Sequence, residues 1–555
     1  MAFLRTILQC QPMRMLALLV FMAGCLPSQD PTSRPLGVNC SRKTGIADHV
    51  PEYLAGVSGG HPLRGDHRLS LRVVLQLRNL EALNSQIAAF TTAGSSEFGK
   101  SLTREQFAER HLPTDEQAQL AVAALRAAGL ETDDRPVGPL LRAWGTAQQV
   151  ERAFGTTIVG GEGRYRPDRQ PSMPSEVIRG VQGIGEHLPP RQWADGSSST
   201  PQPALRPGDI RRAYGVPAEL SGKGQTLAIV GLDGFEDADL DAYAAKHGIR
   251  RVPVRRHLLN GYDGKPRTTG GRLETTMDLQ LQNAVAPDAD EIWAILASQD
   301  DPHGLLDGLN ILANPPPGMP AIRHISVSWG TPESGISQAS SQIFHTVLKQ
   351  LAAQSATVFV ASGDEGAFDA GTSSRIVDSP ASSPFAAAVG GTFLVLGPPR
   401  LETTWSGSGG GYSCFWPAPS WQGRAYGVVS HETMRALPDV ALAADPNSPY
   451  AAIVEGREVT VGGTSAAAPV MAGLAALLAQ SRELEHKTPL GFLPPLLYGA
   501  SCDIPAPGFN DITIGNTHGS QSKGAGIDAT RGMDAATGLG SINLAALIAQ
   551  LACIP

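Results

Sequence analysis

Residues 462–470 read GGTSAAAPV, a stretch that combines a sharp turn with the start of a helix. Two glycines let the backbone turn tightly and approach a ligand closely. Residues 466–478 are apolar on nearly all sides, as expected of a buried helix. Pro469 is expected in the first helical turn, where a missing N–H costs nothing. Ser465 would then lie at a helix N-terminus, whose dipole stabilises developing negative charge. The alternative is a plain N-cap serine.

The composition is that of a globular protein large enough for more than one domain. The chain has 555 residues, of which 42% are hydrophobic and 17% charged. A formal net charge of −8 lacks the basic surplus of a nucleic-acid binder, so no nucleic-acid partner is expected. The 62 glycines and 43 prolines indicate many turns and loops.

The N-terminus has the pattern of an export signal. Residues 15–24 read MLALLVFMAG, an apolar run that follows Arg14 and ends in small residues. The run is too short to span a bilayer comfortably. Residues 22–25 resemble a bacterial lipoprotein cleavage box, which would make Cys25 a lipid-anchored N-terminus. Secretion with an unmodified Cys25 is the alternative. Both readings predict an extracellular or cell-envelope location.

The cysteines outside this leader form no metal-binding pattern, because Cys40, Cys414, Cys502 and Cys553 lie far apart. Export permits disulfides. Cys502 and Cys553 are one candidate pair, and Cys414 is expected to be a free buried thiol.

Two regions with different periodicity follow the leader. In the first, alternating leucines and valines at 69–77 predict a strand, and residues 115–130 predict an amphipathic helix that carries Leu120, Val122 and Leu125. This region reads as an α+β domain. Residues 191–207 are rich in Ser, Pro and Gly without periodicity, which is typical of an exposed linker open to proteolysis.

Beyond this linker, short apolar runs alternate with helical stretches, which predicts a parallel sheet covered by helices on both faces. The expected strands are 226–230, 292–297, 324–328, 357–361 and 386–389. Ligands of such sheets bind at the carboxyl ends of the strands.

Two acidic motifs fall where they would face that edge. Glu274 and Asp278 are four residues apart on an expected helix, so they share one face beside its apolar stripe. Like charges at this spacing repel, and they relax by sharing a proton, which raises one apparent pKa. Such a pair suits a general base that works in acid. A solvated acidic helix face is the alternative.

The second motif follows the buried strand 357–361, where Ser362-Gly363-Asp364 would extend from the sheet edge. If it is protonated, the Asp364 carboxyl can donate a hydrogen bond to an oxyanion. An acidic residue in an ordinary turn is the alternative.

Taken together, these motifs resemble the sedolisin family of serine-carboxyl peptidases, and in particular its kumamolisin-like members with a long propeptide. The resemblance runs from about residue 66 to the C-terminus and follows the family's order. The matching segments are Glu274-x-x-x-Asp278 before Ala286-Pro287, Ser326-x-Ser328-Trp329-Gly330, Ser362-Gly363-Asp364-x-Gly366, Gly409 to Ser413, Pro438-Asp439-Val440, and Gly463-Thr464-Ser465 with Pro469.

The resemblance implies a role for each catalytic residue. Ser465 would attack the peptide carbonyl, and Glu274 would take its proton and later protonate the leaving amine. Asp278 would orient Glu274 and hold the shared proton. Asp364, kept protonated, and the Ser465 N–H would stabilise the oxyanion. Because carboxyl groups replace the usual histidine, activity should peak at acidic pH.

The resemblance also implies a calcium site, substrate contacts and one departure. One Ca²⁺ would be held by the side chains of Asp511 and Asp534, with carbonyls as further ligands. The resemblance implies the carbonyls of Ile512, Thr530 and Gly532 as further calcium ligands, and Ser328, Trp329 and Gly330 as residues that contact the substrate. The family usually has Gly at the position of Thr530. The Thr530 carbonyl can still bind the ion if the backbone φ of this residue is negative. Kumamolisin-like members have Glu where this chain has Gly231, a change that should retune the dyad.

The sequence therefore predicts an exported acid endopeptidase made as a self-processing zymogen, with peptides and its own propeptide as partners. The fold would be a subtilisin-like α/β domain after an α+β propeptide with an antiparallel sheet. The expected segments are 1–25 signal, 26–65 tether, 66–190 propeptide, 191–207 activation linker with cleavage near 197–203, and 208–555 catalytic domain. The alternatives are a tripeptidyl aminopeptidase of this family, a subtilisin that uses His303, and an inactive surface-anchored binding protein.

Overall fold

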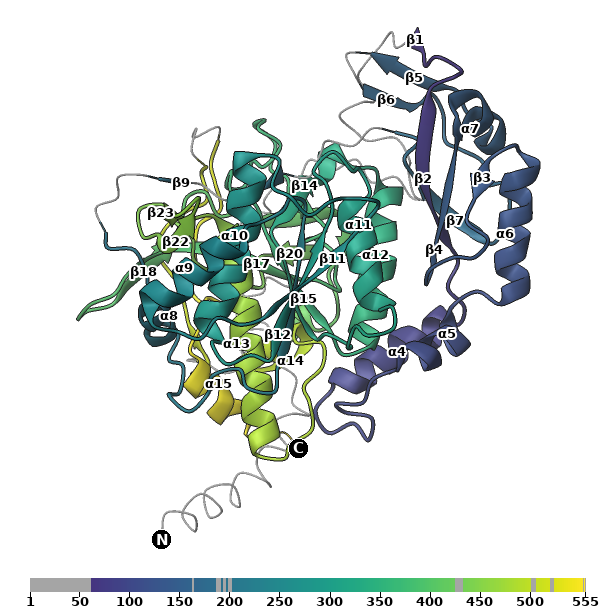
Figure 1. The fold of residues 1–555 in the computed structure, drawn as a ribbon. Coiled ribbons are helices and arrows are strands. Elements are labelled where there is room, and N and C mark those ends of the chain that lie inside the picture. Colours follow the sequence, from purple (N-terminus) through teal and green to yellow (C-terminus); the bar gives the residue numbers. More distant parts are fainter. Residues whose placement is uncertain are drawn as a thin grey trace.

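The computed structural model describes residues 61–161, 164–185, 191–192, 196–197, 202–424, 433–500, 506–519, 524–552 and 554. These residues form an N-terminal domain (residues 61–185) and a larger C-terminal domain (residues 202–554), which lie side by side in Figure 1. The predicted signal peptide, the lipidation site Cys25, nearly all of the tether and the pair Cys502 and Cys553 lie outside the described residues.

The C-terminal domain is built around an eight-stranded, mostly parallel sheet within the described residues. Its order is β11 (Val254–Leu258), β12 (Glu291–Leu296), β10 (Thr226–Gly231), β13 (His324–Val327), β15 (Thr357–Ala361), β17 (Ala387–Val395) and β18 (Leu401–Thr404), with β21 (Val440–Ala443) also paired to β17. Only β18 runs antiparallel to its neighbour among these strands. The subtilisin-like α/β architecture expected from the sequence is therefore present.

Helices cover both faces of this sheet, as Figure 1 shows. One face packs against α10 (Thr269–Val285) and α13 (Thr464–Leu484), with α9 (Asp237–His247) beside them. The other face packs against α11 (Gly304–Ala313) and α12 (Gln338–Ala353). The sheet thus separates two hydrophobic cores, and residues on both faces of its strands are buried. The remaining helices of this domain are α8 (Pro207–Ala213), α14 (Pro494–Ala500) and α15 (Leu544–Leu551).

All five expected strands of the parallel sheet are confirmed; the ends of four shift by at most one residue, whereas β17 continues six residues beyond the expected end, to Val395. The edge strand β11 was not predicted, because its sequence VRRHL is polar and it is only half covered. Helix α10 begins at Thr269, five residues before Glu274. Thr268 caps it, accepting a hydrogen bond from the Gly271 N–H at 2.9 Å.

Helix α13 is the central helix of the domain and follows the opening sequence motif. It begins at Thr464, so Pro469 is its sixth residue and lies beyond the first turn where we expected it. The ring removes one helical hydrogen bond, the one that would reach the carbonyl of Ser465. Although α13 is long and apolar enough to cross a membrane, 94% of its apolar window is buried inside the protein, as in a core helix.

The N-terminal domain has the α+β architecture expected from the sequence. An antiparallel sheet has the order β3 (Glu131–Thr132), β4 (Leu140–Thr146), β2 (Arg68–Leu75) and β7 (Ile178–Gln182). Its buried face packs against α6 (Asp115–Ala127) and α7 (Ala147–Phe154). Leu120 lies on the opposite face of α6 and is 59% exposed, so its inclusion in the apolar stripe was wrong. A small sheet joins β1 (His61–Pro62), β5 (Ile158–Gly161) and β6 (Arg164–Pro167).

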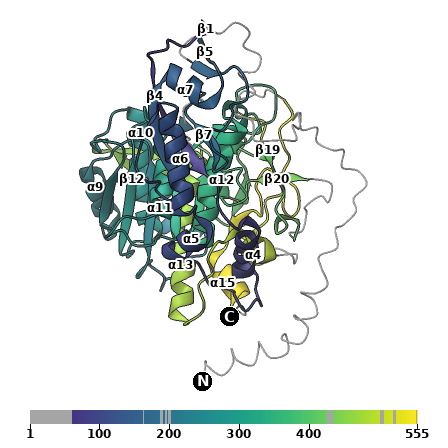
Figure 2. The ribbon, with the colours of Figure 1, turned by 90° about the vertical axis from the view of Figure 1, so that its right-hand side faces the viewer.

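The N-terminal domain packs along one side of the C-terminal domain. Its sheet faces α11 and α12, and α4 (Leu80–Thr91) and α5 (Arg104–His111) reach further along the same side (Figure 2). Val74 and Leu140 join the core beside α11 and α12. Hydrogen bonds add to this contact, including Asn310 Nδ2 to the Val137 carbonyl at 3.0 Å.

The segment between the two domains carries two short strands that pair with the C-terminal domain. Strand β8 (Arg191–Gln192) runs antiparallel to β14 (Trp329–Pro332) and also contacts α10. Strand β9 (Gly196–Ser197) runs antiparallel to β23 (Arg457–Val461), which pairs in turn with β22 (Tyr450–Val454). The predicted linker is therefore held at both of these strands.

The remaining short elements lie around the sheet. They are β16 (Asp378–Ser379), β19 (Gly411–Pro417), β20 (Met434–Leu437), β24 (Phe509–Asn510), β25 (Ser541–Ile542), η1 (Glu333–Gly335) and η2 (Gln422–Arg424). Cys414, in β19, is disulfide-bonded, so the expectation of a free thiol there was wrong.

Candidate active site

Ser465 is the second residue of α13 and is fully buried. Gly463 before the helix has φ 93°, a conformation that glycine adopts without strain. The first N–H groups of a helix have no helical acceptor, so the Ser465 N–H is oriented to bind an anion. Its hydroxyl donates to the carbonyl of Ser328 at 3.2 Å. The sequence motif thus places a serine hydroxyl at the N-terminus of a helix.

Glu274 and Asp278 lie one turn apart on α10, and both are fully buried. The alternative of a solvated acidic helix face is therefore wrong. Burial raises the pKa of Glu274 well above its usual value, the negative charge of Asp278 adds to this, and the hydroxyl of Ser465 partly opposes it. Burial likewise raises the pKa of Asp278, with Ser328 opposing. Two buried carboxyls this close cannot both be ionised, so the pair retains a proton.

Glu274 is the member of this pair that faces the serine. The Ser465 hydroxyl and the Asp364 charge both act on its pKa, so all three groups lie near one another. Neither Glu274 oxygen has a hydrogen bond of good geometry within the described residues. A buried carboxyl with open acceptor sites beside a hydroxyl is suited to take that hydroxyl's proton.

Asp364 follows strand β15 and approaches the start of α13. Its Oδ1 accepts hydrogen bonds from the backbone N–H and the hydroxyl of Thr464, each at 2.8 Å. The Gly363 N–H donates to Thr464 Oγ1 at 3.1 Å, which joins the two segments further. This half-buried carboxyl therefore stands beside the N–H of Ser465, where two donors to one oxyanion would be needed.

Ser328 and Trp329, predicted to bind substrate, have fully buried side chains. Ser328 Oγ contacts Asp278 Oδ1 at 2.7 Å and the Ser465 carbonyl at 3.2 Å. Trp329 packs in the core beside α11 and α12. The backbone is the part that meets a peptide here, because Trp329 pairs with Gln192, and Gly330 with Arg191. Sequence reasoning missed the contact of Ser328 with Asp278, which no spacing rule reveals.

The residues predicted to bind calcium converge on one loop. Asp534 Oδ2 accepts from the Thr530 N–H at 2.7 Å, and Asp511 Oδ2 accepts from the Gly532 N–H at 3.0 Å. Thr530 is not among the residues with positive φ, so its side chain is tolerated, whereas Gly532 has φ 85°. Burial raises the pKa of Asp511, and raises that of Asp534 to about 6.

The chemistry of this set fits a hard cation, because two carboxylates and a turn rich in carbonyls are oxygen donors. No group of three or more His, Cys, Asp or Glu side chains with metal-binding geometry occurs in the described part of the chain. Carbonyls, including that of the buried Ile512, would have to complete the shell.

His303, the histidine of the subtilisin alternative, does not serve Ser465. Its ring is buried at the domain interface, with Nδ1 3.0 Å from Gln182 Oε1 and Nε2 3.0 Å from the Ser70 carbonyl. Both partners belong to the N-terminal domain. The subtilisin-type histidine base is therefore wrong for this residue.

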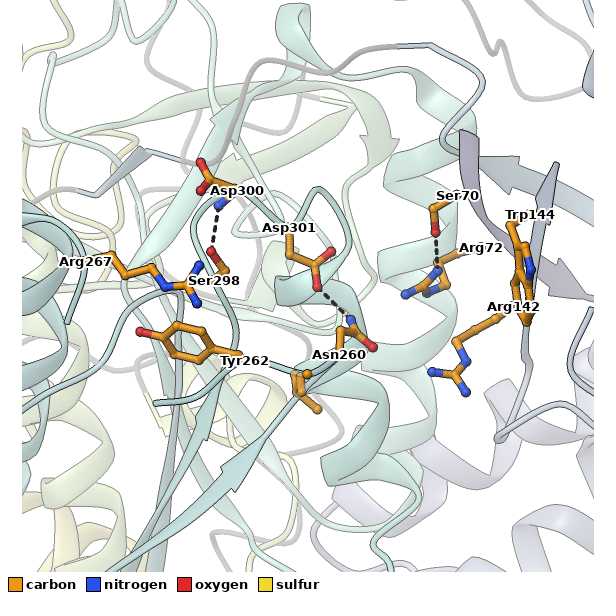
Figure 3. A pocket seen from close by; sticks show the side chains of 12 residues that line it. Ser70, Arg72, Arg142, Trp144, Asn260, Tyr262, Arg267, Ser298, Asp300 and Asp301 are labelled. Carbon is orange, nitrogen blue, oxygen red and sulfur yellow. Dashed lines mark hydrogen bonds between the residues drawn. The ribbon is translucent and has the colours of Figure 1, made fainter. Parts of the chain in front are cut away.

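An open cavity of about 740 Å³ lies beside His303, between the two domains. Figure 3 shows Ser70, Arg72, Arg142 and Trp144 of the N-terminal domain on one side, opposite residues of the C-terminal domain. The cavity has no wall in common with Ser465 or the acidic pair, so it belongs to the interface.

A further group of buried carboxyls was not predicted. Glu333 is the first residue of η1, Asp378 lies in β16 and Asp369 in a turn, and all three are buried. Burial raises the pKa of Asp378, while Arg191 in strand β8 partly opposes this. Single acidic residues far apart in the sequence show no pattern, so their clustering could not be predicted and is visible only in the folded chain.

Comparisons with known proteins agree with this architecture. Residues 55–187 match the family model described as pro-kumamolisin, activation domain, and residues 319–489 match the subtilase family model. Kumamolisin from Bacillus sp. (strain MN-32) is 32% identical over 533 residues, which cover 89% of this chain and 94% of kumamolisin. The chain therefore belongs to the sedolisin family of serine-type peptidases and carries an activation propeptide.

Other relatives span the chain to a similar extent. Sedolisin from Pseudomonas sp. (strain 101) is 28% identical and covers 86% of this chain and 86% of its own length. Tripeptidyl-peptidase 1 of Homo sapiens is 28% identical, covering 88% of this chain and 92% of its own length. The structure of Pseudomonas sedolisin with two molecules of pseudo-iodotyrostatin has 27% identity and a TM-score of 0.56, covering 64% of this chain and 99% of that one.

Proposed function

We propose that this peptidase is an exported serine-carboxyl endopeptidase, made as a self-processing zymogen and active in acid. The observation that carries the proposal is the burial of Glu274 and Asp278 beside the hydroxyl of Ser465. A hydroxyl next to a carboxyl pair that retains a proton is activated by a carboxylate in place of an imidazole.

The residues would divide the reaction as follows. Ser465 Oγ forms a bond to the peptide carbonyl carbon while its proton passes to Glu274. The carbonyl oxygen becomes an oxyanion that accepts from the Ser465 N–H and from a protonated Asp364. Glu274 then gives its proton to the leaving amine as the C–N bond breaks, and water releases the acyl group by the reverse sequence. Asp278 keeps the proton of the pair and orients Glu274.

The N-terminal domain would act as the propeptide that keeps the enzyme inactive. Strands β8 and β9 pair with the backbones of β14 and β23. They therefore take the places in which a peptide substrate would otherwise pair with these two strands. Residues 193–195 and 198–201 lie outside the described residues, so the predicted cleavage near 197–203 stays a prediction.

We also propose one Ca²⁺ held by Asp511 and Asp534 with the carbonyls of Ile512, Thr530 and Gly532. The ion would neutralise two partly buried carboxylates and fix the C-terminal loops beside the sheet. Its role is structural, and no step of the reaction passes through it.

Export, with a lipid anchor at Cys25 as the possible membrane link, remains a proposal that rests on the leader sequence. Processing of the leader is open to direct measurement. Mass spectrometry of the protein isolated from cells would show whether Cys25 is the modified first residue, or whether the protein is secreted without lipid.

Digestion of a peptide library by the acid-activated protein, with mass-spectrometric mapping of the cleaved bonds, tests the function. Internal cleavage that depends on Ser465 is expected below neutral pH. Release of tripeptides from free N-termini alone would favour the tripeptidyl aminopeptidase. Absence of any cleavage across the pH range would favour the inactive binding protein and overturn the proposal.

A further inference from the structure

Pro469 leaves the carbonyl of Ser465 without its usual hydrogen-bond donor within the helix. In an α-helix, the carbonyl of one residue accepts from the N–H four residues later. For Ser465 that residue is Pro469, which has no N–H. The hydroxyl of Ser328 takes this place, with its Oγ 3.2 Å from the Ser465 carbonyl oxygen. Ser328 thus contacts the backbone of the serine that faces the acidic pair.

The same hydroxyl also contacts the acidic pair. Ser328 Oγ lies 2.7 Å from Asp278 Oδ1, and the Ser328 side chain is fully buried. A hydroxyl has one hydrogen to donate and two lone pairs with which to accept. Ser328 Oγ is the donor in both contacts, so its one hydrogen is shared between Asp278 Oδ1, the nearer oxygen, and the Ser465 carbonyl.

A third contact joins Ser465 back to the backbone of Ser328. The hydroxyl of Ser465 donates to the Ser328 carbonyl at 3.2 Å, while the hydroxyl of Ser328 reaches the Ser465 carbonyl. The two serines therefore hold each other through reciprocal side chain-to-backbone bonds. Any shift of β13 relative to α13 would break both bonds, so Ser328 fixes the depth at which Ser465 lies.

We propose that Ser328 is a positioning residue, whose hydroxyl donates to Asp278 Oδ1 and to the Ser465 carbonyl and so holds the acidic pair in place against the backbone of Ser465. This inference rests on the proposed function, because it concerns the proton inventory of that reaction. With the proton held on Asp278, Glu274 is the ionised member and faces the Ser465 hydroxyl. Attack then requires only that this hydroxyl rotate from the Ser328 carbonyl to Glu274.

The surroundings of Asp278 leave Ser328 as the polar group that acts on it. Burial and Ser328 are the two influences on the pKa of Asp278 that the structure shows. A Cβ at Gly231 would lie 3.1 Å from Thr275 Oγ1 and 3.1 Å from Leu296 Cδ2, so a side chain there would require both neighbours to shift.

Kinetics of the processed enzyme test this inference. Ser328→Ala should lower kcat about tenfold with little change in KM, because one hydrogen bond is lost from the positioning chain and none from the peptide. It should also move the alkaline limb of the pH–rate profile to higher pH, since Asp278 loses a donor that favours its ionised form. Ser328→Thr, which keeps the hydroxyl, should restore both values.

The matched control is Ser326→Ala. Ser326 is in the same strand and equally buried, but its hydroxyl accepts from Gln282 Nε2 at 3.2 Å and is not in the positioning chain. This variant should retain the wild-type profile. A shift of the alkaline limb to lower pH in Ser328→Ala would mean that Ser328 does not donate to Asp278, and would overturn the proposal. So would an unchanged kcat and profile.

A second measurement covers a Ser328→Ala enzyme that fails to process. Infrared difference spectra of the Ser465→Ala precursor should contain the C=O band of a protonated carboxyl that disappears in Asp278→Asn. Its absence would overturn the proton assignment. A wild-type protein without acid peptidase activity would instead contradict the proposed function, so the two failures are distinguishable.

Discussion

The backbone of Gly330 lies against the backbone of Arg191 in an antiparallel pair. Arg191 belongs to the linker and Gly330 to the strand that follows β13, so the chain presents its own linker to the site as an extended peptide. Five residues further on, Gly196 pairs with Val461, the residue immediately before Gly462 and the turn into α13. A strand on each side of Ser465 is the arrangement that a bound substrate requires.

This arrangement predicts that Ser465→Ala yields a folded but unprocessed precursor. The side chain is small and buried, so its loss should leave the melting temperature close to that of the wild type. Because the hydroxyl is the attacking group, acid treatment should leave the linker intact. Gel analysis after acid incubation, with Ser326→Ala as the matched serine control, measures the outcome. Normal maturation of the purified Ser465→Ala variant would contradict self-processing.

The acidic pair predicts the pH dependence of the rate. Both pKa values are raised, mainly by burial, so the pair keeps one proton through the acidic range. Activity should fall at low pH when Glu274 takes a second proton, and fall again at higher pH when the pair loses its last one. Glu274→Gln should lower kcat by about 10² to 10⁴ across the profile.

Glu219→Gln, at an exposed position, is the control for that substitution and should behave like the wild type. A rate that keeps rising from acid toward alkaline pH would argue against a carboxyl base. The profile is measured as kcat/KM on a fixed peptide, which reports the free enzyme.

Much of the fold followed from the sequence, because its signals are local. The apolar runs of the parallel sheet were predicted correctly from their periodicity. Strand β11 was missed because a polar edge strand has no apolar period. Pro469 was misplaced because the rule for proline in helices weighs the lost bond alone, and here Ser328 supplies a replacement donor.

The site was predicted in part for the same reason. Glu274 and Asp278 were singled out because a four-residue spacing is visible in the chain, but their complete burial depends on α13 and the sheet. The contact of Ser328 with Asp278 joins residues fifty positions apart. No periodicity records such a contact, and it depends on how α10 packs beside β13.

The calcium proposal predicts a loss of stability on chelation. An ion bound only by the folded chain stabilises it by mass action, about 3 kcal/mol at a hundredfold excess over Kd. Chelator should therefore lower the melting temperature of the processed wild-type enzyme by several degrees, and excess Ca²⁺ should restore it. Asp511→Asn and Asp534→Asn should start lower and respond less.

Asp528→Asn is the control for that experiment, because its exposed carboxylate contacts Asn516 and not the 530–532 loop. Calorimetry with and without chelator measures all four proteins. An unchanged wild-type melting temperature would count against a bound ion.

The contacts of Arg72 predict how acid releases the propeptide. Its guanidinium makes two bonds to Asp307, at 2.8 Å and 2.6 Å, with side chains only 5% and 12% exposed. Burial alone would raise the pKa of Asp307, but the bonds to Arg72 outweigh it and lower the pKa. Such a group stabilises docking above its free pKa, and the benefit is lost as pH falls through the bound value.

Protonation of His303 weakens the docking of the propeptide at milder pH. Burial, with the charge of Arg72, lowers its pKa from 6.5 to about 4, while Asp307 and Asp301 oppose this. Between pH 6.5 and 4 the released histidine binds a proton that the docked one does not, so docking weakens as pH falls, by about 3 kcal/mol in all. His303→Gln, which cannot titrate, should therefore activate more slowly in this range and depend less on pH.

Asp307→Asn should act in the opposite direction. It leaves the Arg72 charge buried without its carboxylate, a change that typically costs about 3 to 5 kcal/mol, so the propeptide should be released at higher pH than in the wild type. Asp66→Asn removes a carboxylate from the exposed pair with Arg64 in the same domain and should change nothing. The pH at half-maximal processing, measured in the wild type and these variants, decides the matter. Equal midpoints for His303→Gln, Asp307→Asn and the wild type would show that acid acts elsewhere.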